Sequence, residues 1–450
     1  MCSIYQCASA TTELTLNLYC VCCCGVLAPG HGLHCAYASR VAYRHERQPG
    51  EVVDKAEEKV TAGAFSCYLY LSSLCNRPSQ PLLRHTDVPQ RVTESFILSG
   101  YRFPDYSLCE CLVSAFRPTN ETGNFWTHFL AVFIFAFNFL ELFWWEGQPA
   151  LSDPFFYPFW NYFIGVFCLL MASSLAHLLN SMSLLIREIC FFVDYGTISA
   201  YTVGSSLAYF YYIHPQAGIP GFDLHNTTQE RQQILEGPFL PPPSSQSLSS
   251  TLPEFHIFFE SFYIPSACVV ALLCTLACCS TRQRWRRYRY VIRTTVFLLP
   301  FAVASTPVFY RLLHPSQHSA ASLPCSSGTL GPFFYRHCFW LLVSALFNIS
   351  KFPERLSPGK FDIWGHSHQW FHCFTFLSIL DELHMIKAEI RALAVPLASA
   401  LTQPSLPGPT LCSTYGVMFA LQGCIGAIIS WFAWCACRNG NTQAEHPKSH

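Results

Sequence analysis

The chain has 450 residues, of which 51% are hydrophobic and only 12% are charged, and its 27 basic residues balance its 27 acidic ones. A soluble domain usually carries about 25% charged residues. The low charge and the repeated apolar runs therefore predict a polytopic helical membrane protein. A net charge of zero gives nucleic-acid binding no support, so we expect no nucleic-acid partner.

The first 90 residues differ from the rest of the chain. They contain a cysteine-rich stretch, 20–24, inside an apolar segment, 14–28, that is too short to cross a bilayer and lacks the basic start of a signal peptide. Residues 40–64 are rich in charge and typical of disorder. We expect residues 1–90 to be a poorly structured region, which either anchors or targets the chain or has no structural role.

Residues 91–124 read as a cytosolic juxtamembrane segment. Within it, residues 107–116 have the apolar periodicity of a helix that could lie on the membrane surface.

Eight apolar segments follow and predict eight membrane-spanning helices, which fill a transmembrane domain from 125 to 437. Polar residues interrupt the second, third and seventh segments, which suits a bundle with an interior. Residues 438–450 form a short tail. The expected spans are 125–146, 154–180, 188–213, 256–279, 290–312, 332–350, 367–386 and 414–437.

Basic residues in the loops predict the orientation of the bundle. The long loop 214–255 holds a single arginine, whereas the next turn holds five, Arg282, Arg284, Arg286, Arg287 and Arg289. This alternation places both termini in the cytosol. Lys387 and Arg391 are an exception, but they continue a helical pattern and weigh less than the five arginines.

Four ionisable residues lie in or at the edge of these apolar runs: His177, Asp194, His368 and His372. An ionisable residue inside a membrane span is costly and marks a functional site by default. His368 and His372, four residues apart, share one helix face, as do Ser173 and His177. Counted from the span ends, all five residues lie within roughly 15 Å of the cytosolic boundary.

Three histidines at one depth predict a metal site. Zinc favours imidazole nitrogen, and catalytic zinc sites commonly use three protein ligands and keep one position open. His177, His368 and His372 would supply the ligands. Asp194 would orient or deprotonate a water molecule, and Ser173 would bond to that water or to Asp194.

Two alternatives compete with this interpretation. Each histidine could instead be a core residue that bonds a carbonyl group or a lipid headgroup. His366 could also replace His368 as a ligand, but residue 366 points to a different helix face from residue 372. We therefore favour His368 and His372.

Two further polar groups have open roles. The first precedes the first span. We favour capping and interfacial anchoring over contact with a cytosolic partner or with the inner ends of the helices. The members of this group are Arg117, Glu121, Asn124 and His128. The second lies about 14 Å or more above His372 along its helix. Its members could rim a ligand entrance or mark the outer interface, and they are Asp381, Glu382 and His384.

Three segments together resemble the progestin and adipoQ receptor family, which includes adiponectin receptors, membrane progestin receptors and bacterial haemolysin III-like proteins. They are 118–128 (PTNETGNFWTH), 173–177 (SSLAH) followed by Asp194-Tyr195, and 353–372 (PERLSPGKFDIWGHSHQWFH). The resemblance covers about 92–437. An eighth span after a seven-helix core resembles the membrane progestin receptor branch.

The resemblance implies a zinc ion bound by His177, His368 and His372, with Ser173 and Asp194 beside it. It implies a plasma-membrane or endomembrane receptor that takes a steroid or lipid ligand and signals to a cytosolic protein, with a G protein as one candidate. The family also resembles the alkaline ceramidases in this arrangement. Hydrolysis of a lipid amide is therefore the alternative function.

Overall fold

A computed structural model describes residues 81–102, 105–146, 153–213, 258–283, 288–313, 326–399 and 408–445. These ranges belong to one compact unit, Leu74–His450. They are almost entirely helical and contain one isolated β-bridge, between Leu83 and Tyr101. The predicted all-α class is confirmed. The expectations for residues 1–80, and for the tail beyond 445, lie outside the described residues.

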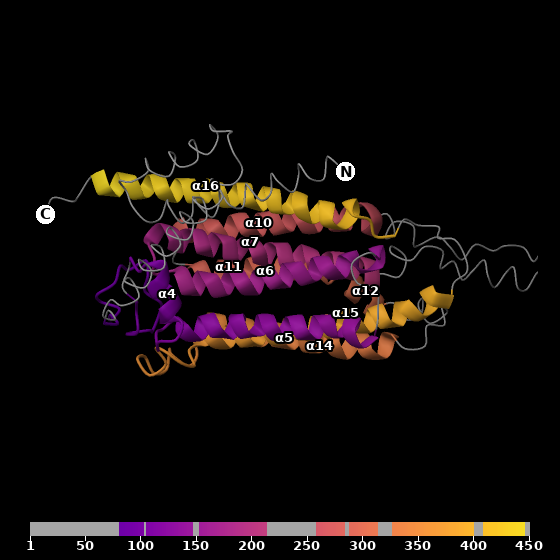
Figure 1. Ribbon diagram of the computed structural model, residues 1–450, viewed down its shortest axis with the longest axis horizontal. Helices are drawn as coiled ribbons and strands as arrows, with labels where there is room; N and C mark the ends of the chain where they lie inside the picture. The colour runs from indigo at the N-terminus through magenta and orange to yellow at the C-terminus, as the bar shows by residue number, and fades with distance from the viewer. Residues whose placement is uncertain are drawn as a thin grey trace, which may run out of the picture. The chain divides into compact units, whose positions relative to one another are not determined.

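Eight long helices account for the eight predicted spans in the described ranges (Figure 1). In chain order they are α5 (Thr122–Glu146), α6 (Tyr157–Leu179), α7 (Leu184–Ala208), α10 (Tyr263–Gln283), α11 (Arg289–Ala304), α14 (Ser326–Ser350), α15 (Ser367–Ser399) and α16 (Val417–Glu445). Short π-helical turns extend some of them: η2 (Tyr209–Ile213), η3 (Phe258–Phe262) and η5 (Cys412–Gly416).

The first seven of these helices form a closed circle. Each packs against the next in the order α5, α6, α7, α10, α11, α14 and α15, and α15 packs back against α5. The last helix, α16, lies outside the circle against α7 and α10, as Figure 1 shows in yellow. The arrangement is therefore a seven-helix core with one added helix.

The helices differ in how well they suit a bilayer. Five (α5, α6, α10, α14 and α16) are long and apolar enough to cross it. A sixth span results if α11 and α12 (Thr306–Leu313), which meet at a bend of 55°, count as one. The remaining two, α7 and α15, carry charged residues that line the internal cavity, among them Asp194 and Glu382. Eight spans and cytosolic termini stay predictions, whereas a polytopic membrane bundle is confirmed.

The short segment before the bundle is also helical. The predicted surface helix is α4 (Leu108–Ser114), and it begins with a capping box. The Ser107 side chain accepts a bond from the backbone N–H of Glu110, and the Glu110 carboxylate accepts one from the backbone N–H of Ser107. A small apolar cluster of Val88, Ile97 and Tyr101 packs ahead of it.

Two glycines allow α6 and α7 to approach closely. A Cβ at Gly165 would lie 3.0 Å from the Cα of Tyr201, and one at Gly204 would lie 3.1 Å from the carbonyl oxygen of Asn161. Small residues let helix backbones touch inside membranes, where packing replaces the hydrophobic effect as the driving force. This contact fixes the position of α6, which carries His177 at its end.

We expect Gly204→Val to lower the thermal unfolding midpoint of the detergent-purified protein by several degrees, because the valine side chain would push α6 and α7 apart. The matched control is Gly426→Val in α16, where a Cβ meets nothing within 4 Å. The control should leave the midpoint near that of the wild type. Equal effects of both substitutions would contradict the close contact.

Candidate metal and ligand site

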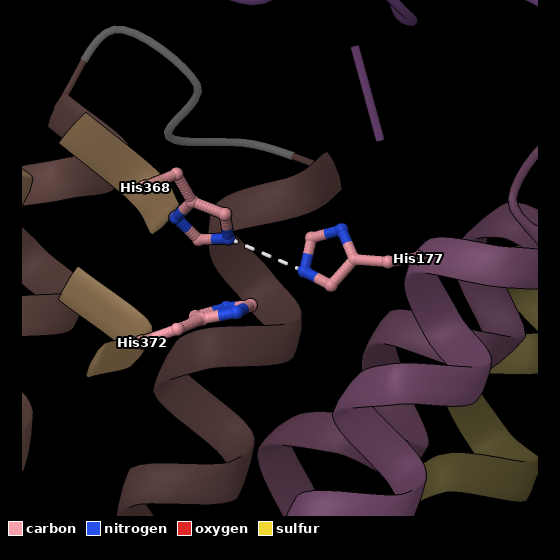
Figure 2. Close-up of side chains that lie close together, drawn as sticks. All are labelled: His177, His368 and His372. Carbon is pink, nitrogen blue, oxygen red and sulfur yellow. Dashed lines mark hydrogen bonds between the residues drawn. The ribbon is translucent and has the colours of Figure 1, made fainter. Parts of the chain in front are cut away.

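The three predicted histidines meet inside the bundle. His177 comes from the last turn of α6, and His368 and His372 come from the first turns of α15. The Nε2 atoms of His177 and His368 are 3.3 Å apart, and one ring nitrogen from each of the three residues lies within 4.8 Å of the other two. Figure 2 shows the three imidazoles turned toward one another. All three rings could contact one metal ion.

Neighbouring side chains orient two of these imidazoles. The Nδ1 atom of His177 lies 2.7 Å from Oε2 of Glu121, and that of His372 lies 2.9 Å from Oγ1 of Thr127. His372 Nδ1 also lies 3.2 Å from the carbonyl oxygen of Asn124. If each Nδ1–H donates to these oxygens, each Nε2 lone pair is left free to bind a metal. Metal-binding histidines are commonly held in this way.

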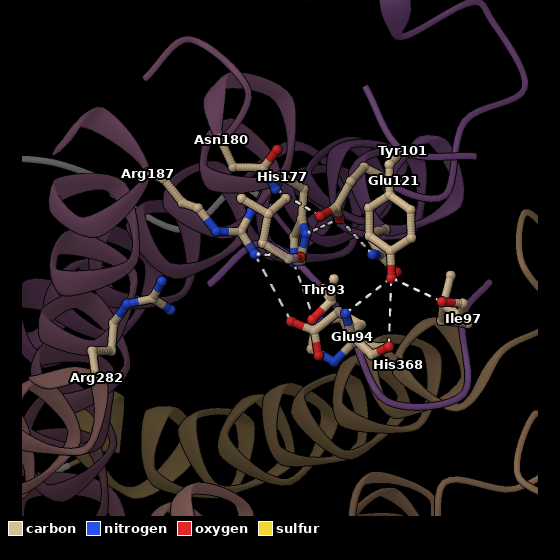
Figure 3. A network of polar contacts seen from close by, with 12 residues as sticks. Thr93, Glu94, Ile97, Tyr101, Glu121, His177, Asn180, Arg187, Arg282 and His368 are labelled. Atoms are coloured by element: carbon tan, nitrogen blue, oxygen red, sulfur yellow. Dashed lines mark hydrogen bonds and ion pairs between the residues drawn. The ribbon is translucent and has the colours of Figure 1, made fainter. Parts of the chain in front are cut away.

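Glu121 is the centre of this hydrogen-bond network (Figure 3). Besides His177, it accepts bonds of 2.7 Å from the amide groups of Asn180 and Asn124. Burial alone would raise the pKa of the Glu121 carboxyl, but His177 and nearby arginines hold that pKa well below its usual value. Glu121 is therefore an ionised, fully bonded carboxylate.

Arg102 holds the end of α6 in place. Its buried guanidinium donates to the backbone carbonyl oxygens of His177 and Leu178, both at 2.6 Å, and to the side chain of Asn180 at 2.5 Å. These carbonyls have no partner within the helix, so Arg102 acts as a cap. The position of the His177 backbone thus depends on a residue that precedes the bundle.

The start of α15 is fixed as firmly. The Glu354 carboxylate accepts the backbone N–H of Ser367 at 2.7 Å and also the Ser367 hydroxyl. His366, the alternative ligand, instead places its Nε2 3.2 Å from the carbonyl oxygen of Asn120. It is not part of the three-histidine group. The geometry thus favours His368 over His366, as the helical spacing predicts.

Asp194 and Ser173 line the same cavity as the histidines. Within the described parts of the chain, neither side chain forms a hydrogen bond with a histidine ring or with the other. The predicted Ser173–Asp194 bond is therefore not present as a direct contact. Their predicted catalytic roles are not tested by this geometry and stay predictions.

The cavity has a volume of about 620 Å³ and extends along the interior of the circle. Basic side chains surround the end near the histidines. Glu94 lies 3.9 Å from Arg187 and 3.3 Å from Arg289, and Figure 3 shows its carboxylate turned toward Arg187. Burial lowers the pKa of the neighbouring Lys351 to about 8. Much of the remaining wall is apolar and includes Leu169, Ile198, Phe301, Leu341 and Phe371.

The structure also shows the contacts of the two polar groups whose roles the sequence left open, the one before the first span and the one at residues 381–384. Glu121 bonds His177 and Asn180 at the end of α6, and Asn124 bonds Glu121. These contacts match the alternative of contact with the ends of the helices rather than the favoured one of capping and anchoring. Asp381 forms an ion pair with Arg336 at the edge of the bundle, but Glu382 is buried and faces the cavity. Its side chain therefore lies inside the bundle.

Fold and site together define an integral membrane protein with a helical bundle, an internal cavity and a buried histidine cluster. A family model described as haemolysin-III related matches residues 116–382. The chain belongs to this family. The resemblance to the progestin and adipoQ receptor family is thereby confirmed.

Several relatives carry the name membrane progestin receptor. The delta receptor of Mus musculus is 31% identical over 69% of this chain and 79% of its own length. The gamma receptor of Homo sapiens is 32% identical over 66% of this chain and 78% of its own. The alpha receptor of Cynoscion nebulosus is 29% identical over 68% and 75%.

Gly123 provides a test of how α15 is positioned. A Cβ at Gly123 would lie 2.3 Å from Nε2 of Gln369. Gln369 cannot easily move, because its amide donates to the Ile363 carbonyl oxygen and accepts the N–H of Gly365. We expect Gly123→Ala to destabilise the protein by about 1–3 kcal/mol through overpacking, measured as a lower unfolding midpoint.

Gly331→Ala in α14 is the control, since a Cβ there meets its nearest neighbour at an ordinary 3.6 Å. It should be neutral or slightly stabilising because alanine is the better helix former. An unchanged midpoint for Gly123→Ala would show that Gln369 is not fixed.

Proposed function

We propose that this chain is a membrane receptor for a progestin-like steroid, which enters the helical bundle from the bilayer and occupies its internal cavity. One observation carries the proposal: a largely apolar cavity of about 620 Å³ ends at a cluster of convergent polar groups. Small-molecule sites commonly have volumes of about 300–1,000 Å³ and this kind of lining. The names of the relatives supply the ligand class.

We propose further that His177, His368 and His372 hold a zinc ion. Two ligand nitrogens at about 2.0–2.1 Å from a tetrahedral zinc lie roughly 3.3 Å apart, and the His177 and His368 Nε2 atoms are 3.3 Å apart. The Glu121 carboxylate contacts Nδ1 of His177. Metal-binding histidines commonly form such a bond through the ring nitrogen that does not bind the metal. When bound, zinc would act as a Lewis acid toward an oxygen atom of the ligand.

The alternative function is hydrolysis of a lipid amide, as in the ceramidases. It is favoured by one observation, namely that Asp194 and Ser173 line the cavity that reaches the histidines. Asp194 would accept a proton from the water molecule that attacks the amide carbon. Ser173 would donate a hydrogen bond that positions this water. Both would be catalytic residues in this reading.

Signalling to a cytosolic protein, with a G protein as one candidate, is part of the receptor proposal. The arginine-rich turn between α10 and α11 is the expected contact, and residues 284–287 of that turn lie outside the described residues. Residence in the plasma membrane or an endomembrane stays a prediction. We also propose that, within the membrane progestin receptors, the chain is most similar to the epsilon member, on the basis of the stretches 94–102, 111–115 and 374–381.

We expect about one zinc per chain in protein purified without chelator, measured by elemental mass spectrometry. His372→Ala should lose the metal, and Glu121→Gln should weaken zinc binding by about 10–100-fold, because it removes the charge that supports His177. The control is His384→Ala, since His384 belongs to no group of metal-binding side chains among the described residues. Less than a tenth of a zinc per chain in the wild type would contradict the metal proposal.

The two functions differ in their response to Asp194→Ala. For a receptor, saturable binding of a radiolabelled progestin should survive this substitution while zinc is retained. For a hydrolase, release of fatty acid from ceramide by the purified protein should fall by at least about 100-fold, as expected for loss of a general base.

Hydrolysis that is abolished by both Asp194→Ala and His372→Ala would show that the chain is more than a receptor. Progestin binding no stronger than that to an unrelated membrane protein would contradict the receptor proposal.

A further inference from the structure

A second polar cluster lies on the wall of the same cavity, away from the histidines. The Glu382 carboxylate of α15 accepts a hydrogen bond from Tyr209 at 2.8 Å, one from Tyr162 at 3.3 Å, and one from Tyr201. Glu382 is 2% exposed, and Glu382, Tyr201 and Tyr209 all line the cavity. We call these four residues the carboxylate cluster.

The carboxylate cluster is not an ion pair of the scaffold. Neighbouring acids on α15 are paired, Asp381 with Arg336 and Glu389 with Arg311. Among the residues that the structure describes, no basic side chain pairs with Glu382. A buried carboxylate is costly unless it is fully bonded. Here the hydroxyl hydrogens of Tyr201 and Tyr209 meet this need, together with that of Tyr162, which Glu382 shares with the Ile379 carbonyl oxygen.

An unpartnered hydroxyl group faces the cavity as well. Ser305 is 1% exposed. It lines the cavity, and its hydroxyl oxygen has no hydrogen-bond partner within the described ranges. Buried polar atoms are rarely left without a partner. This atom therefore points to a polar group supplied by a ligand.

The spacing between the two polar sites sets the length of that ligand. His372 and Glu382 are ten residues apart on one helix. This spacing separates them by about 15 Å along the helix axis. Both line the cavity, and Ile379 and Phe301 contribute to its apolar wall. A ligand that fills the space between them has a long apolar body and a polar group at each end.

We propose that the carboxylate cluster is a second binding subsite, which accepts a hydrogen bond from a hydroxyl group at the far end of an elongated apolar ligand. The reason is the direction of the bonds: the tyrosine hydrogens are donated to Glu382, so the carboxylate cluster itself offers a ligand only oxygen lone pairs. A keto oxygen would compete with Glu382 for those hydrogens. This inference rests on the proposed function, because it places the ligand in the same cavity.

The test uses two steroids, pregnanolone and pregnanedione, which differ only in a hydroxyl versus a keto group at one end. Competition against a radiolabelled progestin on the purified full-length protein gives both affinities. We expect the wild type to prefer the hydroxyl steroid by about tenfold, the effect of one well-formed hydrogen bond. Tyr209→Phe and Glu382→Gln should each reduce this preference to less than about threefold.

The matched control is Tyr211→Phe. Tyr211 lies in the same π-helical turn as Tyr209, but its hydroxyl donates to Ser413 and it does not line the cavity. This variant should keep the full preference. Equal affinity of the wild type for both steroids, or a preference that survives both Tyr209→Phe and Glu382→Gln, would overturn the inference.

A second measurement separates this inference from the steroid proposal. If the wild type binds neither steroid, the receptor proposal fails, and thermal stabilisation by hexadecanediol is compared with that by hexadecanol, which lacks the second hydroxyl. Greater stabilisation by the diol that disappears in Tyr209→Phe supports the subsite. Equal stabilisation by the two alcohols, or none by either, overturns it.

Discussion

The hydrogen-bonded carboxylate of Glu121 is the interaction on which the site depends. It joins the start of α5 to the end of α6 through Asn124, His177 and Asn180. A buried carboxylate without partners would cost several kcal/mol, so these three side chains must meet it together. Arg102 supplies a nearby positive charge and caps α6 at the same point. The orientation of His177 follows from this network.

The circle of seven helices encloses the cavity at whose end this network lies. Close contact of α6 with α7 through Gly165 and Gly204, and of α15 with α5, brings the end of α6 opposite the start of α15. Charged residues that would be costly in lipid then face one another across the interior. The two long helices that are not among the candidate spans, α7 and α15, carry Asp194 and Glu382 on the cavity wall.

Sequence reasoning located the helices and the histidines for a simple physical reason. Long apolar runs have few alternatives to a helix in a membrane, and an ionisable side chain within such a run is conspicuous. The positions of His177, His368 and His372 follow from that contrast. Glu121 does not stand out in this way, because it lies in a polar segment where acidic residues are common. It is also 56 residues from His177 along the chain. Glu382 does stand out as an acidic residue in an apolar run. Helical rise gives its height above His372 but does not show whether its side chain faces the cavity or the outer interface.

The amino-acid sequence by itself determined that the protein is an all-helical membrane bundle, and it selected three imidazoles at a common depth. Both properties depend on composition and helical periodicity, which are local. Only the tertiary structure decided that Glu121 and Arg102 fix His177 and that Glu382 faces three tyrosines. These contacts join segments far apart in the chain, and their partners are set by how the helices pack around the circle.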